Sequence, residues 1–448
     1  SGTDSLALAG GANTLTIANV ETITGGTGAD IVTLGAAVSG ASIALGAGAD
    51  SLTLASGANT LTLGADLETL IGGSGVDAIT FSAAVSGVAV RLGAGSDSLV
   101  LADGANTLTL AAIESVTGGT GADTVTLAEG QTSGSIDLGA GTDSLALANA
   151  ANTLTVSNAE TITGGSAADS IILGAAISGA GISLGAGLDS LTLVGSANTI
   201  TATGVETITG GTGADDVTLG AAVSGATINL GSGTDSLALA GGANTLTIAN
   251  VETITGGTGA DIVTLGAPIS GATINLGAGT DRLTLANGAN TVTVTNTEVV
   301  NGGTGTDAIT VTGSTATRLS GGEGNDTLVG GSGGDQISGG AGADQLSGGS
   351  GVDRFVYVAA TESPVAGADT IADFDATADL LVFTGLLTGA FSFLGAAALG
   401  VTGETQARFD DSTKVLLIDL GGDGNADMKM VLTGVSITDL DAGDFIWL

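Results

Sequence analysis

A repeat of 46 residues runs through residues 1–312 and constrains the fold of this chain more than any other feature. One glutamate and one asparagine mark each repeat, and each series contains a single interval of 47 residues. The markers are Glu21, Glu68, Glu114, Glu160, Glu206, Glu252 and Glu298, with Asn13, Asn59, Asn106, Asn152, Asn198, Asn244 and Asn290. A fixed period of this length is typical of solenoids and repeat arrays, not of a globular core.

One repeat contains the short runs SLAL, NTLTI, ETIT, IVTL and SIAL, in which apolar and polar residues alternate. Each run has about four residues, which suits a short strand and is too short for a helix. The threonine, valine and isoleucine content of the runs also favours the pleated conformation. We therefore expect an all-β fold: a right-handed parallel β-solenoid with a β-rich cap at its carboxyl end.

Aspartates recur through the repeats with steps of 20 residues that alternate with steps of 26 or 27. Both steps end in related loops, such as GGTGAD and LGAGTD, so we interpret each step as one coil and each repeat as two coils of unequal length. The aspartates would then form one column at a spacing of ~4.8 Å, whereas the marker glutamates and asparagines, present in every second coil, would form no continuous ladder. The column contains Asp4, Asp30, Asp50, Asp77, Asp97, Asp123, Asp143, Asp169, Asp189, Asp215, Asp235, Asp261, Asp281 and Asp307.

Residues 321–356 consist of four tandem nonapeptides of the form G-G-x-G-x-D-x-U-x, with U apolar: GGEGNDTLV, GGSGGDQIS, GGAGADQLS and GGSGVDRFV. Glycines allow the positive φ of a tight loop, and the last three residues alternate as a strand. Two nonapeptides complete a coil of ~18 residues. Asp326 then faces Asp344, and Asp335 faces Asp353. Paired carboxylates among loop carbonyls form an all-oxygen cage that suits calcium. The alternative is a glycine-rich linker with scattered acids.

These nonapeptides resemble those of the repeat-in-toxin (RTX) family. The chain as a whole is similar to bacterial surface-layer proteins that carry hemolysin-type calcium-binding repeats. The resemblance implies a calcium-loaded β-roll, with multiple Ca²⁺ ions held by loop carbonyls and by sixth-position aspartates. The implied ligands are Asp307, Asp326, Asp335, Asp344 and Asp353, with Gly322, Gly324, Gly331, Gly333, Gly340, Gly342, Gly349 and Gly351. The same assignment extends upstream to Asp30, Asp50, Asp77, Asp97, Asp123, Asp143, Asp169, Asp189, Asp215, Asp235, Asp261 and Asp281.

Half of the upstream loops depart from the RTX pattern because a leucine replaces the first glycine. These leucines are Leu45, Leu92, Leu138, Leu184, Leu230 and Leu276. A backbone carbonyl survives the replacement, but a positive φ at that position does not fit a leucine. The upstream aspartates therefore either bind calcium or cap their turns through local side-chain to backbone hydrogen bonds.

The composition excludes several classes of function. A net charge of −38 with seven Lys plus Arg argues against nucleic acid and anionic lipid as partners. The absence of cysteine and histidine removes disulfides, thiol nucleophiles, imidazole bases and the usual zinc ligands. No uncharged apolar run is long enough to span a membrane, and we expect no amino-terminal signal peptide. Residues 1–35 recur identically at 232–266, so we expect that Ser1 lies inside a repeat of a longer protein.

The composition changes after residue 356. The segment DRFVYVAATESPVAGADTIADFDATADLLVF and the later VLLIDLGGDGNADMKMVLTGV resemble the region that follows the nonapeptides in RTX proteins. Asp419, Asp423 and Asp427 allow a calcium loop, but their spacing misses the D-x-D-x-D-G pattern, which leaves a plain turn as the alternative. The ending DFIWL, residues 444–448, resembles the uncleaved export signal of type I secretion. We expect residues 1–312 to form the repeat solenoid, 313–358 the calcium β-roll, and 359–448 the cap and signal region.

Three functions fit this pattern. The first is a secreted, calcium-dependent structural protein that assembles with itself as a surface layer or extracellular filament. The second is the stalk of an adhesin or biofilm-matrix protein, and the third is the carboxy-terminal part of a secreted hydrolase. The acids repeat with the coils and no nucleophile motif is present, so we expect no catalytic residues and favour the structural protein, located outside a Gram-negative cell. The expected partners are other copies of the chain and, through the carboxyl terminus, the type I secretion apparatus.

Overall fold

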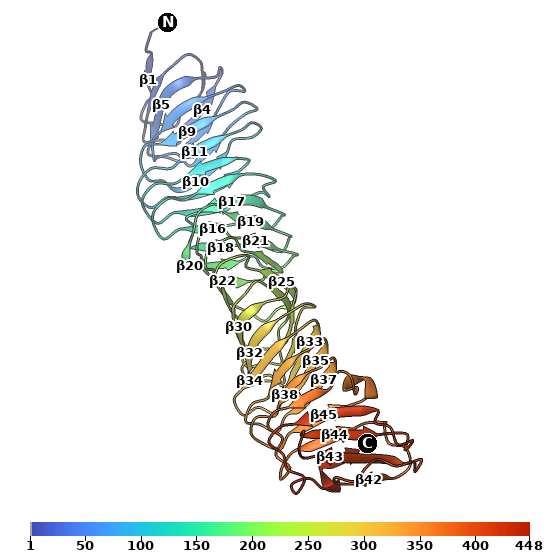
Figure 1. Cartoon of the computed structure of the whole chain (residues 1–448). Coiled ribbons are helices and arrows are strands. Elements are labelled where there is room, and N and C mark those ends of the chain that lie inside the picture. The colour runs from blue at the N-terminus through green and yellow to red at the C-terminus, as the bar shows by residue number, and fades with distance from the viewer. Residues whose placement is uncertain (1) are drawn as a thin grey trace. The chain divides into compact units, whose positions relative to one another are not determined.

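The computed structural model describes residues 2–448, and this part of the chain is a parallel β-solenoid (Figure 1). Each coil contributes two strands, because every strand of the repeats pairs in parallel with the second strand after it. For example, β1 (Ser5–Ala7) pairs with β3 (Thr22–Gly26), and β2 (Thr14–Ile17) pairs with β4 (Ile31–Leu34). The predicted all-β parallel solenoid is therefore confirmed, while Ser1 lies outside the described residues.

The chain divides into two compact units. The amino-terminal unit comprises Ser1–Gly220 with Leu230–Gly233, and the carboxy-terminal unit comprises Ala221–Asn229 with Thr234–Leu448. Each unit has a first sheet built mainly of odd-numbered strands and a second sheet built mainly of even-numbered strands. The only helical elements of the described residues are the short 3-10 segments η1 (Ala360–Glu362) and η2 (Ala442–Asp444). None of the helices in residues 2–448 has the length and hydrophobicity that crossing a bilayer requires.

The strands of the amino-terminal unit are as follows. Its first sheet contains β1 (Ser5–Ala7), β3 (Thr22–Gly26), β5 (Ser39–Gly46), β7 (Thr60–Leu63), β9 (Ala78–Phe81), β11 (Ser98–Val100), β13 (Ser115–Thr117), β15 (Ser135–Asp137), β17 (Thr153–Ser157), β19 (Ser170–Leu173), β21 (Ser190–Thr192) and β23 (Thr207–Thr209). Its second sheet contains β2 (Thr14–Ile17), β4 (Ile31–Leu34), β6 (Ser51–Thr53), β8 (Thr69–Ile71), β10 (Ser86–Arg91), β12 (Thr107–Ala111), β14 (Thr124–Leu127), β16 (Ser144–Ala146), β18 (Thr161–Thr163), β20 (Ser178–Ser183), β22 (Thr199–Thr203) and β24 (Asp216–Leu219).

The carboxy-terminal unit continues the same arrangement. Its first sheet contains β25 (Ser224–Asn229), β27 (Thr245–Ala249), β29 (Ile262–Leu265), β31 (Arg282–Thr284), β33 (Val299–Thr304), β35 (Arg318–Glu323), β37 (Gln336–Ala341), β39 (Arg354–Tyr357), β41 (Leu380–Phe383) and, as its last strand, β46 (Phe445–Trp447). Its second sheet contains β26 (Ser236–Ala238), β28 (Thr253–Thr255), β30 (Ser270–Asn275), β32 (Thr291–Thr295), β34 (Ala308–Thr312), β36 (Thr327–Val329), β38 (Gln345–Ser347) and β40 (Asp369–Ile371), followed by β45 (Met428–Leu432), β44 (Val415–Asp419), β43 (Thr405–Asp410) and β42 (Phe391–Phe393).

Stacked aliphatic side chains form the core between the two sheets. Val32, Leu52 and Leu70 occupy equivalent positions of three successive coils, and each is 0% exposed. Burying a side chain of this size contributes about 2 kcal/mol to stability. The outward positions of the same strands carry mostly threonine, serine and alanine, as the alternating sequence predicts.

The repeat does not consist of two coils, as we predicted from the aspartate spacing. The strands of one repeat number five, for instance β1 to β5, and two strands make one coil. One repeat of 46 residues therefore makes two and a half coils, and paired residues lie 17 to 21 positions apart. Because the number of strands is odd, equivalent strands of consecutive repeats lie in opposite sheets.

Aromatic side chains gather at the carboxyl end, where β46 closes the first sheet against β41. Trp447 stacks on Phe383 with ring centroids 4.6 Å apart and contacts Phe391 at 4.9 Å. Strands β44 and β45 pair antiparallel and form a hairpin. In its turn the Asp419 carboxylate accepts the backbone N–H groups of Gly422 and Gly424, as a plain turn requires.

Candidate calcium site

The nonapeptide aspartates form hydrogen-bonded ladders at the edges of the solenoid, each immediately before a strand. At the second-sheet edge the backbone N–H of Asp307 donates to Asp326 Oδ1 at 2.8 Å, and the N–H of Asp326 donates to Asp344 Oδ1 at 2.8 Å. The N–H of Asp344 continues the ladder to Asp369 Oδ1 at 2.9 Å. Each step advances one coil, so the predicted juxtaposition of Asp326 and Asp344 is confirmed.

The first-sheet edge carries a second ladder of the same kind. The N–H of Thr317 donates to Asp335 Oδ1 at 2.8 Å, and the N–H of Asp335 donates to Asp353 Oδ1 at 2.7 Å. The N–H of Asp353 donates to Asp379 Oδ1 at 2.9 Å. Asp335 therefore faces Asp353 as predicted. The aspartates of alternate nonapeptides lie at opposite edges of the coil.

Only one oxygen of most ladder carboxylates has a hydrogen-bond partner. The Oδ2 atoms of Asp307, Asp326 and Asp344 are buried without one, whereas the Asp369 carboxylate has the Tyr357 hydroxyl as a neighbour. Asp335 differs, because its Oδ2 accepts the Gly331 N–H of its own loop at 2.7 Å. A buried, unpaired carboxylate oxygen is costly unless the group is neutralised by a proton or a cation.

Burial also raises the affinity of these carboxylates for protons. It raises the pKa of Asp326 and of Asp353 to about 6 and that of Asp369 to about 7, although the donated N–H groups act in the opposite direction. The neighbouring ladder aspartates add to the increase through charge repulsion. Without a cation these sites therefore hold protons that an exposed aspartate would release.

The first glycine of a loop leaves room for the second carboxylate oxygen, Oδ2. A Cβ at Gly302 would lie 2.8 Å from Asp307 Oδ2, and a Cβ at Gly330 would lie 2.6 Å from Asp335 Oδ2. The carbonyl oxygens of Gly321 and Gly348, one coil further along, point at the same two positions. The absence of a side chain therefore allows a carboxylate oxygen and a carbonyl oxygen to converge.

The predicted second and fourth loop glycines adopt the left-handed region in three of the four nonapeptides. These residues are Gly322, Gly324, Gly340, Gly342, Gly349 and Gly351, with φ between 88° and 157°. The corresponding Gly331 and Gly333 lie outside that region. The second nonapeptide therefore has a different loop conformation, and it is the one whose aspartate binds its own backbone.

Upstream, the ladders combine three residue types: the marker asparagines and glutamates form no continuous ladder of their own, as expected, but they join those of the aspartates. The N–H of Asn106 donates to Asp123 Oδ1 at 2.9 Å, and the N–H of Asp123 donates to Asp143 Oδ1 at 2.7 Å. The N–H of Asp143 then donates to Glu160 Oε2 at 2.7 Å. An Asn-Asp-Asp-Glu series thus occupies four successive coils, because the longer glutamate side chain reaches the same acceptor position.

The aspartates also form two columns in each unit instead of the single column that we predicted. In the amino-terminal unit, Asp30, Asp50, Asp123, Asp143 and Asp215 precede second-sheet strands, while Asp77, Asp97, Asp169 and Asp189 precede first-sheet strands. In the carboxy-terminal unit, Asp235 and Asp307 lie at the second-sheet edge and Asp261 and Asp281 at the first-sheet edge. The odd number of strands in a repeat causes this alternation.

Unpaired carboxylate oxygens recur in the upstream ladders. The Oδ2 atoms of Asp30, Asp50, Asp77, Asp97, Asp123, Asp143, Asp169, Asp189, Asp261 and Asp281 are buried without a hydrogen-bond partner. Burial raises the pKa of Asp50, Asp97, Asp143, Asp189 and Asp281. The other carboxylate oxygen accepts a backbone N–H of the preceding coil, for example that of Asp123 at Asp143, so these aspartates do not cap their own turns through local hydrogen bonds.

The leucines at the first loop position do not disturb the backbone. Leu45 has no positive φ, and the first glycines of the other loops, such as Gly25 and Gly321, have none either. The Leu45 side chain is 2% exposed in the core, while its carbonyl oxygen points at Gly25 of the preceding coil. The replacement therefore keeps the carbonyl and costs no backbone strain, contrary to our expectation.

Sequence reasoning missed Asp369 and Asp379, which end the two ladders of the carboxy-terminal unit. A signal was available, because Asp369 lies in GADTI, which matches the last part of a nonapeptide. The marker asparagines and glutamates were also missed as ladder members. Among the described residues no three acids gather at one point, so any cation held here depends largely on carbonyl oxygens.

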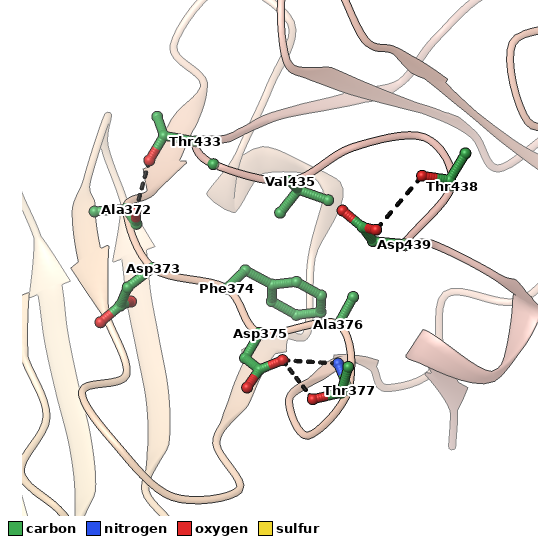
Figure 2. A pocket seen from close by; sticks show the side chains of 11 residues that line it. Ala372, Asp373, Phe374, Asp375, Ala376, Thr377, Thr433, Val435, Thr438 and Asp439 are labelled. Atoms are coloured by element: carbon green, nitrogen blue, oxygen red, sulfur yellow. Dashed lines mark hydrogen bonds between the residues drawn. The ribbon is translucent and has the colours of Figure 1, made fainter.

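A separate acidic pocket of about 590 Å³ lies beside the cap (Figure 2). Asp373, Asp375 and Asp439 line it, with Phe374 and Val435 between them. Each carboxylate already accepts hydrogen bonds, from the Gly348, Thr377 and Ser436 N–H groups respectively. This pocket therefore lacks the unpaired buried oxygen that characterises the ladders.

The RTX calcium-binding nonapeptide repeat family matches this chain in four segments, residues 18–37, 45–79, 249–267 and 320–355. The chain carries RTX calcium-binding nonapeptide repeats. Three of the four matches lie upstream of the tandem nonapeptides and contain Asp30, Asp50, Asp77 and Asp261. The RTX repeats therefore supply ladder aspartates in both units.

Two solved structures are similar to parts of the chain. The AlgE6R2 subunit of the Azotobacter vinelandii mannuronan C5-epimerase is 29% identical over 31% of this chain and 92% of that chain, with a TM-score of 0.23. The AlgE6R3 subunit of the same enzyme is 23% identical over 40% of this chain and 80% of that chain, with a TM-score of 0.19. These TM-scores are too low for either likeness to bear on function. No curated protein matches the chain.

Proposed function

We propose that this protein is a secreted, calcium-dependent structural protein of the bacterial cell surface, which assembles with itself as a layer or filament. The observation that carries the proposal is the series of buried Oδ2 atoms without a partner. In a chain of charge −38 such a series needs cations, and calcium prefers oxygen ligands of this kind.

In the carboxy-terminal unit the ligands would be Oδ2 of Asp307, Asp326 and Asp344 with the carbonyl oxygens of Gly321 and Gly339. The Gly321 and Gly339 carbonyls point at Gly302 and Gly321, where the Asp307 and Asp326 oxygens also converge. Calcium would supply positive charge at this site, where these carboxylate and carbonyl oxygens would hold it. The chain itself supplies the fixed geometry, because each Oδ1 is already held by a backbone N–H.

A structural role agrees with the distribution of charge. Within the strands of the described amino-terminal unit, the charged residues are Arg91, Asp137 and Asp216. The exposed Thr107 and Thr109 stack on Thr124 and Thr126 in the next coil, which gives a flat, uncharged face. Once calcium neutralises the edges, such faces can pack against a neighbouring molecule without strong repulsion.

Secretion accounts for the calcium requirement in physical terms. Submicromolar cytosolic calcium leaves the acidic ladders repulsive, whereas millimolar extracellular calcium fills even weak sites. Type I export would read the last residues, 444–448, before the chain folds, because in the folded protein β46 is part of the first sheet. Hydrolysis is not proposed, because the ladder acids already bind backbone N–H groups.

Electron microscopy at high protein concentration and millimolar calcium tests the proposal. The parent protein should form sheets or filaments. Substitution of Asp123, Asp169, Asp215 and Asp261 by asparagine removes carboxylate charge and should leave monomers or short oligomers. A matched variant, T109K/T126K, charges one outward face without touching a ladder, and it should block lateral packing while calcium uptake stays unchanged. A parent protein that remains monomeric would refute the array and favour the adhesin stalk.

A further inference from the structure

An outward row on the first sheet of the carboxy-terminal unit concentrates positive charge. Strand pairing places Arg282, Val299, Arg318, Gln336 and Arg354 at equivalent positions of successive coils. Three of the chain's seven lysine and arginine residues therefore lie on one line. A parallel row two residues further along each strand carries polar side chains, including Asn301, Ser320 and Ser338.

The guanidinium groups of this row have no partner within residues 2–448. The two ion pairs in the described part of the chain join Arg91 to Glu129 and Lys414 to Asp411, so neither involves the row. Arg282, Arg318 and Arg354 are all exposed. In a chain with an excess of 38 negative charges, three unpaired arginines on one face are available to an external anion.

Two concave regions of the same sheet adjoin the row. The larger, about 450 Å³, is lined by Arg318, Gln336, Ser320 and Ser338 and is bordered by the segment around Glu362. The smaller, about 200 Å³, is lined by Gln336, Arg354 and carboxy-terminal residues such as Leu448. Gln336 lines both regions, so they adjoin at this side chain, and the term groove denotes the two together. Glu362 is the one acidic side chain that lines it, and its carboxylate accepts the Val358 N–H at 2.8 Å.

We propose that this groove binds an anionic polysaccharide whose acid groups are carboxylates, through Arg318 and Arg354 with Gln336 between them. A guanidinium group binds a carboxylate through two parallel hydrogen bonds, and the amide and hydroxyl groups of Gln336, Ser320 and Ser338 suit sugar hydroxyls. Arg318 and Arg354 are two coils apart, on the order of 9.6 Å by the usual strand spacing. An extended polyuronate with two-fold symmetry presents the carboxylates of alternate sugars on one side, which matches arginines in alternate coils.

An acidic protein segment fits the groove less well than a polysaccharide. The ladder aspartates of another copy of this chain are inaccessible, because they are 0–4% exposed and bind backbone N–H groups. The aspartates that directly precede this row, Asp335 and Asp353, are buried in the same way and do not reach the arginines.

Isothermal titration calorimetry of the full chain with hexagalacturonate in millimolar calcium tests the proposal. Neutral cellohexaose and a hexaglutamate peptide, both of six units, are titrated separately for comparison. Hexagalacturonate should bind, the neutral sugar should not, and the peptide should bind at least tenfold more weakly. The double variant R318Q/R354Q should weaken sugar binding at least tenfold, because both carboxylate partners are lost. The control R91Q removes one positive charge from the amino-terminal unit and should leave the affinity unchanged.

Three results would overturn the proposal: no binding by the parent, equal binding by R318Q/R354Q, or tighter binding of hexaglutamate than of the sugar. The last result would assign the groove to an acidic protein. Both arginines are exposed, so the variant should bind calcium like the parent, and a calcium titration verifies that it is folded. Sugar binding is independent of self-assembly, because the array test changes other residues than Arg318 and Arg354. Either result of the sugar titration therefore leaves the array proposal unaffected.

Discussion

The backbone N–H of Asp326 donates to Asp344 Oδ1 at 2.8 Å, while Asp344 Oδ2 is buried without a partner. One carboxylate therefore has two separable roles. The first oxygen satisfies the backbone of the preceding coil, and the second is available to a cation. Asparagine keeps the first role and loses the charge of the second, whereas alanine loses both.

Replacement of Asp344 therefore separates the two roles. D344N should bind calcium at least tenfold more weakly at its site, yet unfold in EGTA at a denaturant concentration no lower than the parent. D344A should be less stable in EGTA by about 1–3 kcal/mol, because the Asp326 N–H is left buried and unpaired. Calcium titration and denaturant unfolding measure the two effects. Equal losses of stability for both variants in EGTA would contradict the division of roles.

Removal of calcium should destabilise the nonapeptide coils. A site that binds only the folded state contributes RT ln(1 + [L]/Kd), or about 2.7 kcal/mol when calcium is at 100 times its Kd. Circular dichroism just below the Tm of the calcium-loaded protein should therefore lose strand signal from at least residues 313–356 during an EGTA titration, and magnesium should not restore it, because magnesium demands a tighter octahedral site. An unchanged spectrum in excess EGTA would refute calcium-coupled folding.

Stability without calcium should fall as the pH rises. Burial raises the pKa of Asp326 and Asp353 to about 6 and that of Asp369 to about 7, compared with about 3.9 in an unfolded chain. The folded state therefore binds more protons than the unfolded state between about pH 4 and 7, and its stability decreases through that window. In EGTA the Tm should be higher at pH 5 than at pH 7.5.

Calcium should reverse this trend, because it needs the deprotonated carboxylates. The increase in Tm on adding calcium should be larger at pH 7.5 than at pH 5. The triple variant D326N/D353N/D369N serves as the control and should show a flatter pH dependence in EGTA. A parent Tm in EGTA that rises between pH 5 and 7.5 would contradict the argument.

The sequence predicted the strands, the parallel solenoid and the pairing of Asp326 with Asp344, since these depend on local alternation and on the fixed nonapeptide length. It did not predict which edge each upstream aspartate occupies. One sequence repeat of 46 residues contains five strands, whereas one coil contains two. The odd number of strands could have been counted from the five apolar-polar runs of one repeat. The aspartate spacing alone suggested two coils per repeat and gave no sign of the additional half coil.

The role of Leu45 could not be derived from the loop pattern. A glycine in a repeat motif suggests a positive φ, but the first position of the loop has none, and its glycine instead avoids a collision with a facing carbonyl oxygen. That constraint depends on the neighbouring coil, which no single loop reveals. The ladder role of Glu160 was missed for a related reason, because it depends on side-chain reach between coils.

Deletion of residues 444–448 should reduce secretion, because these residues resemble a type I export signal, while calcium binding by the nonapeptides persists. The structure adds a second effect, since the deletion also removes β46 and the contacts of Trp447 with Phe383 and Phe391. A lower Tm is therefore expected together with the loss of export. Comparing the amounts of protein in the medium and in the cells measures export, and a melting curve measures the stability of the cap.

F391A distinguishes these two effects. It removes the ring that contacts Trp447 at 4.9 Å and Phe445 at 5.0 Å but leaves the last five residues intact. Loss of this half-buried ring should destabilise the cap by about 2–3 kcal/mol. If the terminal residues are the signal, F391A should be exported like the parent because type I export acts on the unfolded chain, whereas the deletion should remain in the cell. Equal retention of both variants would mean that cap stability, not the terminal sequence, limits secretion.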